Sequence, residues 1–402
     1  MKSIKKEADF FFELSWEVCN KVGGIYTVIT SKIQQMLKHY KFNYYTIGPY
    51  FPEKNITDKF KLADPPKFLK ESFEKLHLMG IKCHFGKWLV DGEPNTILID
   101  YSDYTYKVNE IKGQLWDNYQ IDSMNSKYHD FDEPMIWSTC AGILLEEIKK
   151  RLPSKKIVLQ CHEWMAGGAL LHLKSVKSKV GTVFTTHATM LGRTLSANNV
   201  DLYGQLENLN PKEEAYKYGI PEKFLAENAC ANAADAFTTV SEITAIEATH
   251  FFGIQPDVIL CNGLDTKVFP TFDDVSVKHK LLKNKVKKFL KFYFFPYYSF
   301  DLDDTLIFFL AGRYEYQNKG VDVYIEALGK LNEELKKKKS NKTIIAFIWV
   351  PAGVKEIKPE IMENRTFYED IEDSVQDGIE GLKDRVIYGL LGKKPLNEEF
   401  LL

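Results

Sequence analysis

The sequence predicts an α/β fold with two Rossmann-like domains facing a cleft, the second of them incomplete in this chain. Short apolar runs end abruptly in polar residues and are followed by helix-like segments, which is typical of buried parallel strands. This alternation recurs along most of the 402 residues, without an internal repeat or a low-complexity tract. Because ligands of open α/β sheets bind beyond the carboxyl ends of the strands, the polar residues after each run are the candidate site residues.

Six runs show the strand pattern most clearly. Each is rich in apolar or β-branched residues and leads into a polar segment, so the polar tails should line one cleft between the two sheets. The runs are KIVLQ (156–160), GTVFTT (181–186), AFTTV (236–240), DVIL (257–260), TLIFFLAG (305–312) and IIAFIWVPAG (344–353).

The runs indicate where the domains lie. Residues 1–266 hold enough of them for a complete N-terminal domain. Residues 267–303 form a connector, with a lysine-rich helix and an aromatic cluster (KHKLLKNKVKKFLKFYFFPYYSF) that either binds a polyanion or is a solvated helix with packed aromatics. Residues 304–402 have two clear strands and then a long charged helical stretch, so we expect a partial C-terminal domain with a helical insertion.

Composition and charge restrict the function classes. The formal net charge is -2, from 53 basic and 55 acidic residues, so no global field draws the chain to nucleic acid or to an anionic membrane. No apolar run reaches the roughly 20 residues of a membrane span, and the first residues lack a signal-peptide core. The six cysteines form no CxxC pair, and the nine histidines are dispersed. We therefore expect a cytoplasmic protein without a protein-built metal site.

The stretch KVGG, residues 21–24, follows the apolar run FFELSWEV and precedes a helix-like segment. Backbone amides at such a strand-to-helix turn, together with the helix dipole, favour an anion, and Lys21 adds a positive charge. The stretch matches neither the dinucleotide nor the P-loop pattern. Gly23 and Gly24 therefore indicate either a phosphate or sugar site or a simple tight turn.

The stretch GRYEYQNKG, residues 312–320, raises a related question in the second domain. Arg313 sits just beyond a buried strand, and Lys319 follows six residues later at the start of an amphipathic helix. Two cations in this arrangement suit a diphosphate, because guanidinium and ammonium groups bind phosphate oxygens strongly. The alternative is two exposed cations beside turns.

Two histidines are expected at the carboxyl ends of neighbouring strands, His162 in CHEW and His187 in TTHAT. Taken singly, each is more often structural than functional. Together with Glu163, beside the first, and Arg193, six residues after the second, they indicate a polar pocket for sugar hydroxyls and a departing phosphate.

Two further signals are weaker. Asn262 and Gly263 end another strand with a turn pair that tolerates positive φ, so they serve as a loop turn or let the backbone approach a ligand. DFDE, residues 130–133, resembles the DxD that holds a divalent metal in some sugar transferases. It directly precedes a helical run, and acidic residues there complement a helix N-terminus, which is the interpretation we favour.

With these residues assembled, the sequence resembles the animal and fungal type of glycogen synthase, which are retaining glucosyltransferases of the GT-B fold. The resemblance rests on stretches that occur in the family's order from residue 10 to about 333. These are FELSWEVCNKVGGIYTVI, NYYTIGPY, KGQLWD, CHEWMAGGAL, VFTTHATMLGRTLSA, AFTTVSEITAIEATHFF, PDVILCNGLD and FFLAGRYEYQNKGVDVYIEALGKLN.

The resemblance implies transfer of glucose from UDP-glucose or ADP-glucose to the non-reducing end of an α-1,4-glucan, without a metal or other cofactor. It implies that Arg313 and Lys319 grip the donor diphosphate and that His187 faces the donor glucose. The residues implied to line the donor site or support the same crevice are Lys21, Gly23, Gly24, His162, Glu163, Arg193, Asn262 and Gly263.

The chain also departs from the family. A segment of the form E-x-x-G-x-x-P-x-E, which supplies a catalytic-site glutamate, is not found, and neither is the arginine-rich helix that senses glucose 6-phosphate. We therefore expect little transferase activity from these 402 residues alone. The alternatives are a fragment, one half of a split synthase, or a non-catalytic remnant that binds glucan or nucleotide sugar. A phosphorylase-like enzyme with pyridoxal phosphate is a weaker alternative.

The same resemblance suggests partners. They are a nucleotide sugar and glycogen, a second chain that supplies the missing C-terminal half, and further copies of this chain. The helical stretch 358–390 aligns loosely with a region of oligomer contacts in the family. Nucleic acid and membrane are not expected as partners.

Overall fold

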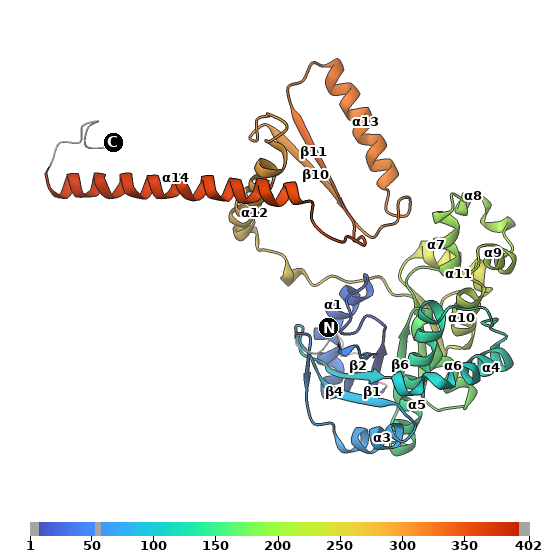
Figure 1. Cartoon of the computed structure of the whole chain (residues 1–402). Helices are drawn as coiled ribbons and strands as arrows, with labels where there is room; N and C mark the ends of the chain where they lie inside the picture. The colour runs from blue at the N-terminus through green and yellow to red at the C-terminus, as the bar shows by residue number, and fades with distance from the viewer. Residues whose placement is uncertain (1–7, 53–57, 394–402) are drawn as a thin grey trace. The chain divides into compact units, whose positions relative to one another are not determined.

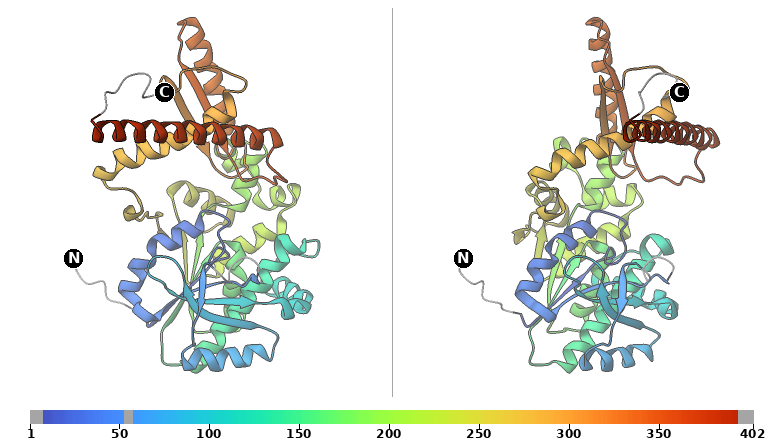
Figure 2. Two further views of the ribbon diagram at one scale, coloured as in Figure 1. Left: turned by 60° about the vertical axis from the view of Figure 1, so that its left-hand side comes forward. Right: turned by 90° about the vertical axis from the view of Figure 1, so that its left-hand side faces the viewer.

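A computed structural model of the chain describes residues 8–52 and 58–393. The chain divides into two compact units, 1–266 and 267–402. The first unit ends at the residue where the sequence pattern places the end of the N-terminal domain. Figures 1 and 2 show the two units, each of which is described by itself below.

The first unit is built around one sheet, which has nine strands among the residues described. β4 is antiparallel to both of its neighbours, and all other pairs are parallel. The strands, in sheet order, are β3 (Phe60–Leu62), β4 (Lys82–Trp88), β5 (Asn95–Asp100), β2 (Tyr44–Pro49), β1 (Phe10–Leu14), β6 (Ile157–His162), β7 (Gly181–Thr186), β8 (Ala236–Thr239) and β9 (Val258–Ile259).

Helices follow most of these strands. In chain order they are α1 (Ile25–Tyr40), α3 (Lys67–His77), α4 (Val108–Tyr119), α5 (Glu133–Arg151), α6 (Gly167–Ser175), α7 (Met190–Ala197), α8 (Leu202–Gln205), α9 (Pro211–Lys217), α10 (Pro221–Ala233) and α11 (Glu242–Phe252). Short 3-10 or π turns are η1 (Lys41–Asn43), η2 (Ser102–Lys107), η3 (Tyr128–Asp132), η4 (Trp164–Ala166), η5 (Leu206–Asn208) and η6 (Thr266–Val268).

The core of the first unit lies on both faces of the sheet. Phe12 and Leu14 of β1 belong to the larger cluster, in which α5 is buried along most of its length. Ile29 and Ile33 of α1 pack in a smaller cluster with Trp88. Since successive side chains of a strand point to opposite faces, Glu13 lies on the face opposite Phe12 and Leu14.

The second unit is far less complete. Its two strands, β10 (Thr305–Ala311) and β11 (Thr343–Trp349), pair in parallel, and α13 (Val321–Lys337) connects them. α12 (Phe272–Phe294) and α14 (Pro359–Leu391) flank this pair. Only three of its described large apolar side chains are buried, Leu290, Val321 and Ile345. The structure thus confirms both strands and the long helical stretch expected from the sequence.

The segment expected to be a separate connector belongs to this second unit. The Phe289 ring on α12 lies 6.0 Å from that of Phe347 on β11, and the Phe292 ring lies 6.4 Å from that of Tyr368 on α14. The aromatic residues of the connector therefore pack on the partial sheet and the long helix. This packing favours the interpretation of a solvated helix with packed aromatics.

The turn between β1 and α1 contains the KVGG stretch, as predicted. The anionic group bound to the amides of this turn is a side chain of the protein itself, the Glu17 carboxylate. The buried carboxylate of Glu17 accepts hydrogen bonds from the amides of Gly23 (3.0 Å) and Tyr26 (2.8 Å). It thereby caps α1, whose N-cap residue, Gly24, offers no side chain. A Cβ at Gly23 would lie 2.5 Å from the Glu17 carboxylate, so glycine is needed there for this close approach.

We therefore expect Gly23→Ala to destabilise the first unit by about 1–3 kcal/mol, because the added methyl group displaces the capping carboxylate. Gly24→Ala is the matched control, since a Cβ there meets nothing within 4 Å. Urea unfolding followed by tryptophan fluorescence measures the difference, because five of the six tryptophans, Trp16, Trp88, Trp116, Trp137 and Trp164, lie in the first unit. Equal unfolding free energies for the two variants would contradict this role of Gly23.

Candidate active site at the carboxyl ends of the central strands

The parallel strands β1, β6 and β7 bring the predicted histidines together. Leu14 of β1 pairs with Cys161 of β6, and His162 pairs with Thr185 of β7. His162 is the last residue of β6, and His187 follows β7 directly. Nδ1 of His162 lies 2.9 Å from Nε2 of His187, so the two imidazoles are hydrogen-bonded.

A carboxylate that the sequence analysis did not single out completes this group. Oε1 of Glu13, on β1, lies 2.7 Å from Nε2 of His162. Both side chains are fully or almost fully buried, with exposed fractions of 0% and 1%. Glu13 stands inside an otherwise apolar strand, and a charged residue there is the only sequence signal that could have identified it.

Glu13 is ionised in spite of its burial. Lys32 Nζ, from α1, lies 2.5 Å from Glu13 Oε1, and the Tyr44 hydroxyl donates to Oε2. Burial raises the pKa of Glu13, but the charge of Lys32 and the hydrogen bond from His162 outweigh this effect and lower the pKa to about 2. Lys32 is also fixed by Gln160, whose Oε1 lies 3.1 Å from Nζ.

Both histidines are neutral near pH 7. Burial and then the neighbouring His162 and Lys32 lower the pKa of His187 to about 3. Burial likewise lowers the pKa of His162, against the opposing hydrogen bond to Glu13. A neutral imidazole carries one donor and one acceptor, so His187, which is only half-buried, can form polar contacts with an uncharged hydroxyl group.

Glu163 supports the backbone beside His187. It has a φ of 65°, and its buried Oε1 accepts hydrogen bonds from the amides of His187 (2.8 Å) and Ala188 (3.2 Å). Burial raises the pKa of this carboxyl group, whereas the charge of Arg193 on α7 opposes the increase. Glu163 thus fixes the turn that carries His187.

A second group of polar residues, also missed from the sequence, fixes the start of α7. Thr189 caps the helix by accepting from the amide of Gly192 (3.1 Å), and its hydroxyl donates to Glu247 on α11 (2.6 Å). Glu227 on α10 accepts from the amide of Met190 (2.9 Å). Burial raises the pKa of Glu227 well above its usual value. These contacts position the helix on which the half-buried Arg193 lies.

The remaining site residues of the first unit lie in exposed loops. Lys21 is exposed, and its Nζ lies 5.4 Å from the centre of the Tyr26 ring. Asn262 and Gly263 are exposed in the loop after β9. Gly24 faces open space, unlike Gly23, whose amide is bonded to Glu17. Their contacts to a ligand stay a prediction.

Arg313 and Lys319 lie together in one loop between β10 and α13. The Arg313 guanidinium contacts Glu315 (2.9 Å) and is about half exposed. The aliphatic part of the Lys319 side chain packs against Gly312. A Cβ atom added at Gly312 would lie 3.3 Å from Cγ of Lys319. Gly320 ends the loop with a φ of 67° and is the N-cap residue of α13. The loop thus carries two cations at the carboxyl end of a strand, as the sequence predicted.

The acidic stretch 130–133 lies at the start of α5, as the helix-start interpretation predicts. Asp130 pairs with Lys223 (2.6 Å), Asp132 with Lys112 (3.3 Å), and Glu133 accepts from Tyr101 (2.8 Å). Within residues 8–52 and 58–393, no three His, Cys, Asp or Glu side chains gather as metal ligands would.

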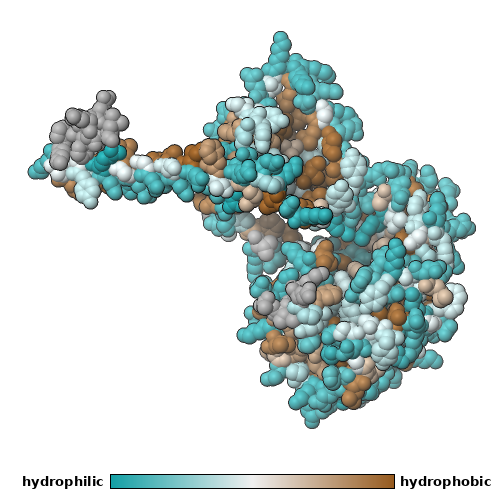
Figure 3. Space-filling model, viewed as in Figure 1, coloured by the Kyte–Doolittle hydropathy of each residue, from teal (hydrophilic) through white to brown (hydrophobic). Residues whose placement is uncertain are grey.

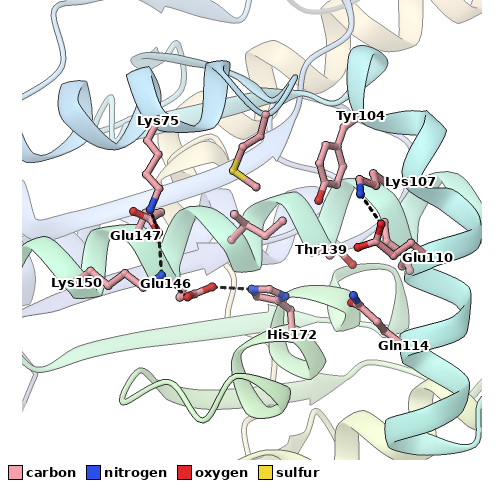
Figure 4. A pocket seen from close by; sticks show the side chains of 13 residues that line it. Lys75, Tyr104, Lys107, Glu110, Gln114, Thr139, Glu146, Glu147, Lys150 and His172 are labelled. Atoms are coloured by element: carbon pink, nitrogen blue, oxygen red, sulfur yellow. Dashed lines mark hydrogen bonds and ion pairs between the residues drawn. The ribbon is translucent and has the colours of Figure 1, made fainter.

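A separate pocket of about 360 Å³ lies among α3, η2, α4, α5 and α6 (Figure 4). The charged side chains that line this pocket form ion pairs or hydrogen bonds with one another. Glu147 pairs with Lys75 (2.8 Å) and Lys150 (2.9 Å), and Glu146 lies 3.0 Å from His172. None of the predicted site residues line it. The candidate active site is therefore the strand-end group and not this pocket.

We predict that His187 stays neutral from pH 8 to pH 5 in the folded chain, because its pKa is about 3. Nuclear magnetic resonance titration of the imidazole measures this, and the same chain in denaturing urea is the control, where the group should titrate near 6.5. Since the unfolded state then binds more protons below that pH, the unfolding free energy should fall on acidification. Protonation of folded His187 near pH 6.5 would contradict the prediction.

Comparisons with known proteins identify the family of the chain. A profile of the family described as glycogen synthase matches residues 13–401. The chain is 36% identical to liver glycogen [starch] synthase of Rattus norvegicus over 94% of its length, and 38% identical to glycogen [starch] synthase isoform 2 of Saccharomyces cerevisiae over 93%. It spans about half the length of these relatives, 54% of each.

A solved structure supports the fold. The catalytic domain of starch synthase IV from Arabidopsis thaliana, bound to ADP and acarbose, superposes with a TM-score of 0.51 at 14% identity, covering 92% of this chain and 72% of that one. This similarity agrees with the GT-B type of α/β fold. In the described part of the chain, no helix is both long and apolar enough to cross a membrane. The chain belongs to the glycogen synthase family.

Proposed function

We propose that the chain functions in glycogen synthesis, as the part of a synthase that binds a nucleotide sugar and an α-1,4-glucan. The reaction is retaining transfer of glucose from UDP-glucose or ADP-glucose to the non-reducing end of the glucan. The observation that carries this proposal is the family match over residues 13–401, which includes the strand-end histidines and the cationic loop.

In this proposal, His187 faces the donor glucose, and Arg313 and Lys319 hold the diphosphate. Cleavage of the anomeric C–O bond places negative charge on the departing phosphate. Cations that bind more strongly as this charge grows lower the barrier. The ion pair of Arg313 with Glu315 is partly exposed, so the guanidinium can exchange it for a phosphate at little cost.

We extend the proposal to the remaining site residues. Arg193 would assist at the diphosphate, and Lys21 and Gly24 would line the donor site from the loop before α1. Fixed cations take the role that a metal ion has in other sugar transferases, so the proposed reaction has no resident metal or cofactor. Binding of the nucleotide sugar should accordingly be unchanged by a chelator.

The alternative is a non-catalytic binding protein or one half of a split synthase. The chain spans about half the length of its relatives, and its second sheet has two strands among residues 267–393. Transfer of glucose to glycogen by the purified chain alone would contradict the expected low activity and would exclude both alternatives.

The second unit favours a polypeptide partner. A hollow of about 400 Å³ between α12 and the strands is lined by apolar residues that include Leu282, Val286, Phe309 and Trp349. Figure 3 shows hydrophobic residues over β10 and β11. We propose that a second polypeptide chain, which supplies the remaining part of the C-terminal domain, adds strands to this sheet and covers the exposed apolar side chains.

The long helix α14 favours self-association. Ile371, Val375, Ile379 and Leu382 recur at spacings of four, four and three residues, and each is 40–56% exposed. Figure 3 shows hydrophobic residues along this helix. An exposed apolar stripe of this kind is buried when two helices pack side by side. We propose that copies of the chain associate through α14.

We also propose a cytoplasmic location. All six cysteines are free thiols, as is usual in a reducing compartment.

The nucleotide-sugar site is tested by calorimetric titration with UDP-glucose, ADP-glucose and a malto-oligosaccharide. We expect one nucleotide sugar to bind, and Arg313→Ala and Lys319→Ala each to weaken it about 10- to 100-fold, because each removes a charge-assisted contact of about 1.5–3 kcal/mol. Lys330→Ala is the matched control, since Lys330 is exposed on α13 and pairs with Glu326. Undiminished binding by both variants would contradict the proposed role of Arg313 and Lys319 at the diphosphate, and binding of the glucan alone would favour the non-catalytic alternative.

Self-association is tested by analytical ultracentrifugation. We expect a species larger than the 46.4 kDa monomer for the unaltered chain, and the monomer for Ile371→Asp combined with Ile379→Asp. Asp373→Asn combined with Asp377→Asn is the control, because it alters the opposite side of the same helix. A monomeric unaltered chain would exclude association through α14.

A further inference from the structure

His162 stands between a carboxylate and a second histidine, in a chain of hydrogen bonds across three strands. Its Nε2 lies 2.7 Å from Glu13 Oε1, and its Nδ1 lies 2.9 Å from His187 Nε2. Glu13 is on β1, His162 ends β6, and His187 follows β7. The order of the strands in the sheet therefore fixes the order of the three side chains.

The first link of this chain has a defined direction. Lys32 lies 2.5 Å from Glu13 Oε1, and the Tyr44 hydroxyl donates to Oε2. An ionised carboxylate has acceptors only. His162 must therefore carry its proton on Nε2 and donate it to Glu13. In a neutral imidazole this leaves the lone pair on Nδ1.

The second link follows from the first. Because Nδ1 of His162 can only accept, Nε2 of His187 must be the donor of the hydrogen bond between them. The only proton of a neutral His187 ring is then on Nε2, and its Nδ1 is an acceptor. A sugar hydroxyl is a matching donor, whereas a carbonyl oxygen or an anion, which can only accept, does not match Nδ1.

We propose that Glu13 is a positioning residue that acts through His162 to hold His187 in the Nε2–H tautomer, with Nδ1 left to accept a hydrogen bond from a donor-sugar hydroxyl. The part played by the hydroxyl rests on the proposed function. The tautomer does not, because it follows from contacts within the first unit. Lys32 contacts the same Oε1 atom that accepts from His162, whereas Tyr44 contacts Oε2.

The tautomer is measured directly by nitrogen-15 nuclear magnetic resonance of the unaltered chain. Protonated and unprotonated imidazole nitrogens have well separated shifts, and His187→Gln and His162→Gln variants assign the signals. We expect a proton on Nε2 and a lone pair on Nδ1 in both residues. A proton on Nδ1 of His187 in the unaltered chain overturns the proposal, whatever the protein binds.

Three substitutions separate positioning from a merely structural role. Glu13→Leu removes the acceptor, so the two tautomers of His187 should mix. Glu13→Gln should restore the single tautomer, because Lys32 requires an oxygen at the Oε1 position. Tyr44→Phe removes the hydroxyl from Oε2 and leaves Oε1 in place, so it should not change the tautomer. If Glu13→Leu does not fold, the tautomer measured in the unaltered chain still decides.

Binding distinguishes failure of this proposal from failure of the proposed function. With a single tautomer in the unaltered chain, Glu13→Leu should weaken nucleotide-sugar binding about two- to tenfold, because the apparent dissociation constant rises as the fraction of the Nε2–H tautomer falls. Glu13→Gln should bind as tightly as the unaltered chain. The expected tautomer without any nucleotide-sugar binding contradicts the proposed function alone. A variant with mixed tautomers that binds as tightly as the unaltered chain contradicts the positioning role alone.

Discussion

A parallel sheet places the last residue of every strand at one edge, and the first unit depends on this constraint. β1, β6 and β7 are neighbours although about 150 residues separate the first two in the chain. Their register puts His162 beside both Glu13 and His187. A shift of β6 by one residue would turn His162 to the opposite face, because successive side chains of a strand alternate. The geometry of the histidine pair is therefore a property of the whole sheet.

Buried carboxylates are the second recurring feature of this edge. Glu13 is balanced by Lys32 and His162, Glu17 by two backbone amides, and Glu163 by the amides of His187 and Ala188. A buried charge without such partners would cost several kcal/mol. Each carboxylate thus holds the loop or side chain that bonds to it, so the surroundings of His187 are positioned by contacts within the protein.

The two units differ in how much apolar surface they bury. In the first, the strands and α5 are enclosed on both faces, whereas in the second the apolar side chains of β10, β11 and α14 are largely exposed. A two-stranded sheet buries too little surface to be stable without further packing. The loop with Arg313 and Lys319 follows β10 of this two-stranded sheet. The stability of the proposed nucleotide-sugar site therefore depends on the partner that covers the apolar side chains of the second unit.

The amino-acid sequence indicated the family and the strands β1 and β6 to β11, whereas β2, β3, β4 and β5 were not identified from it. It placed His162, His187, Arg313 and Lys319 at strand ends, because apolar periodicity and the polar residues that follow are local features. It also identified Gly23, as part of either a ligand site or a tight turn, and the structure shows that the group approaching Gly23 closely is the Glu17 carboxylate. The partners of these residues follow from the three-dimensional packing of the strands and helices and could not be read from local patterns. Lys32 and Tyr44 carry no local signal, and the only signal at Glu13 is a charge inside an apolar strand. The contacts among these three residues join different elements that strand order brings together.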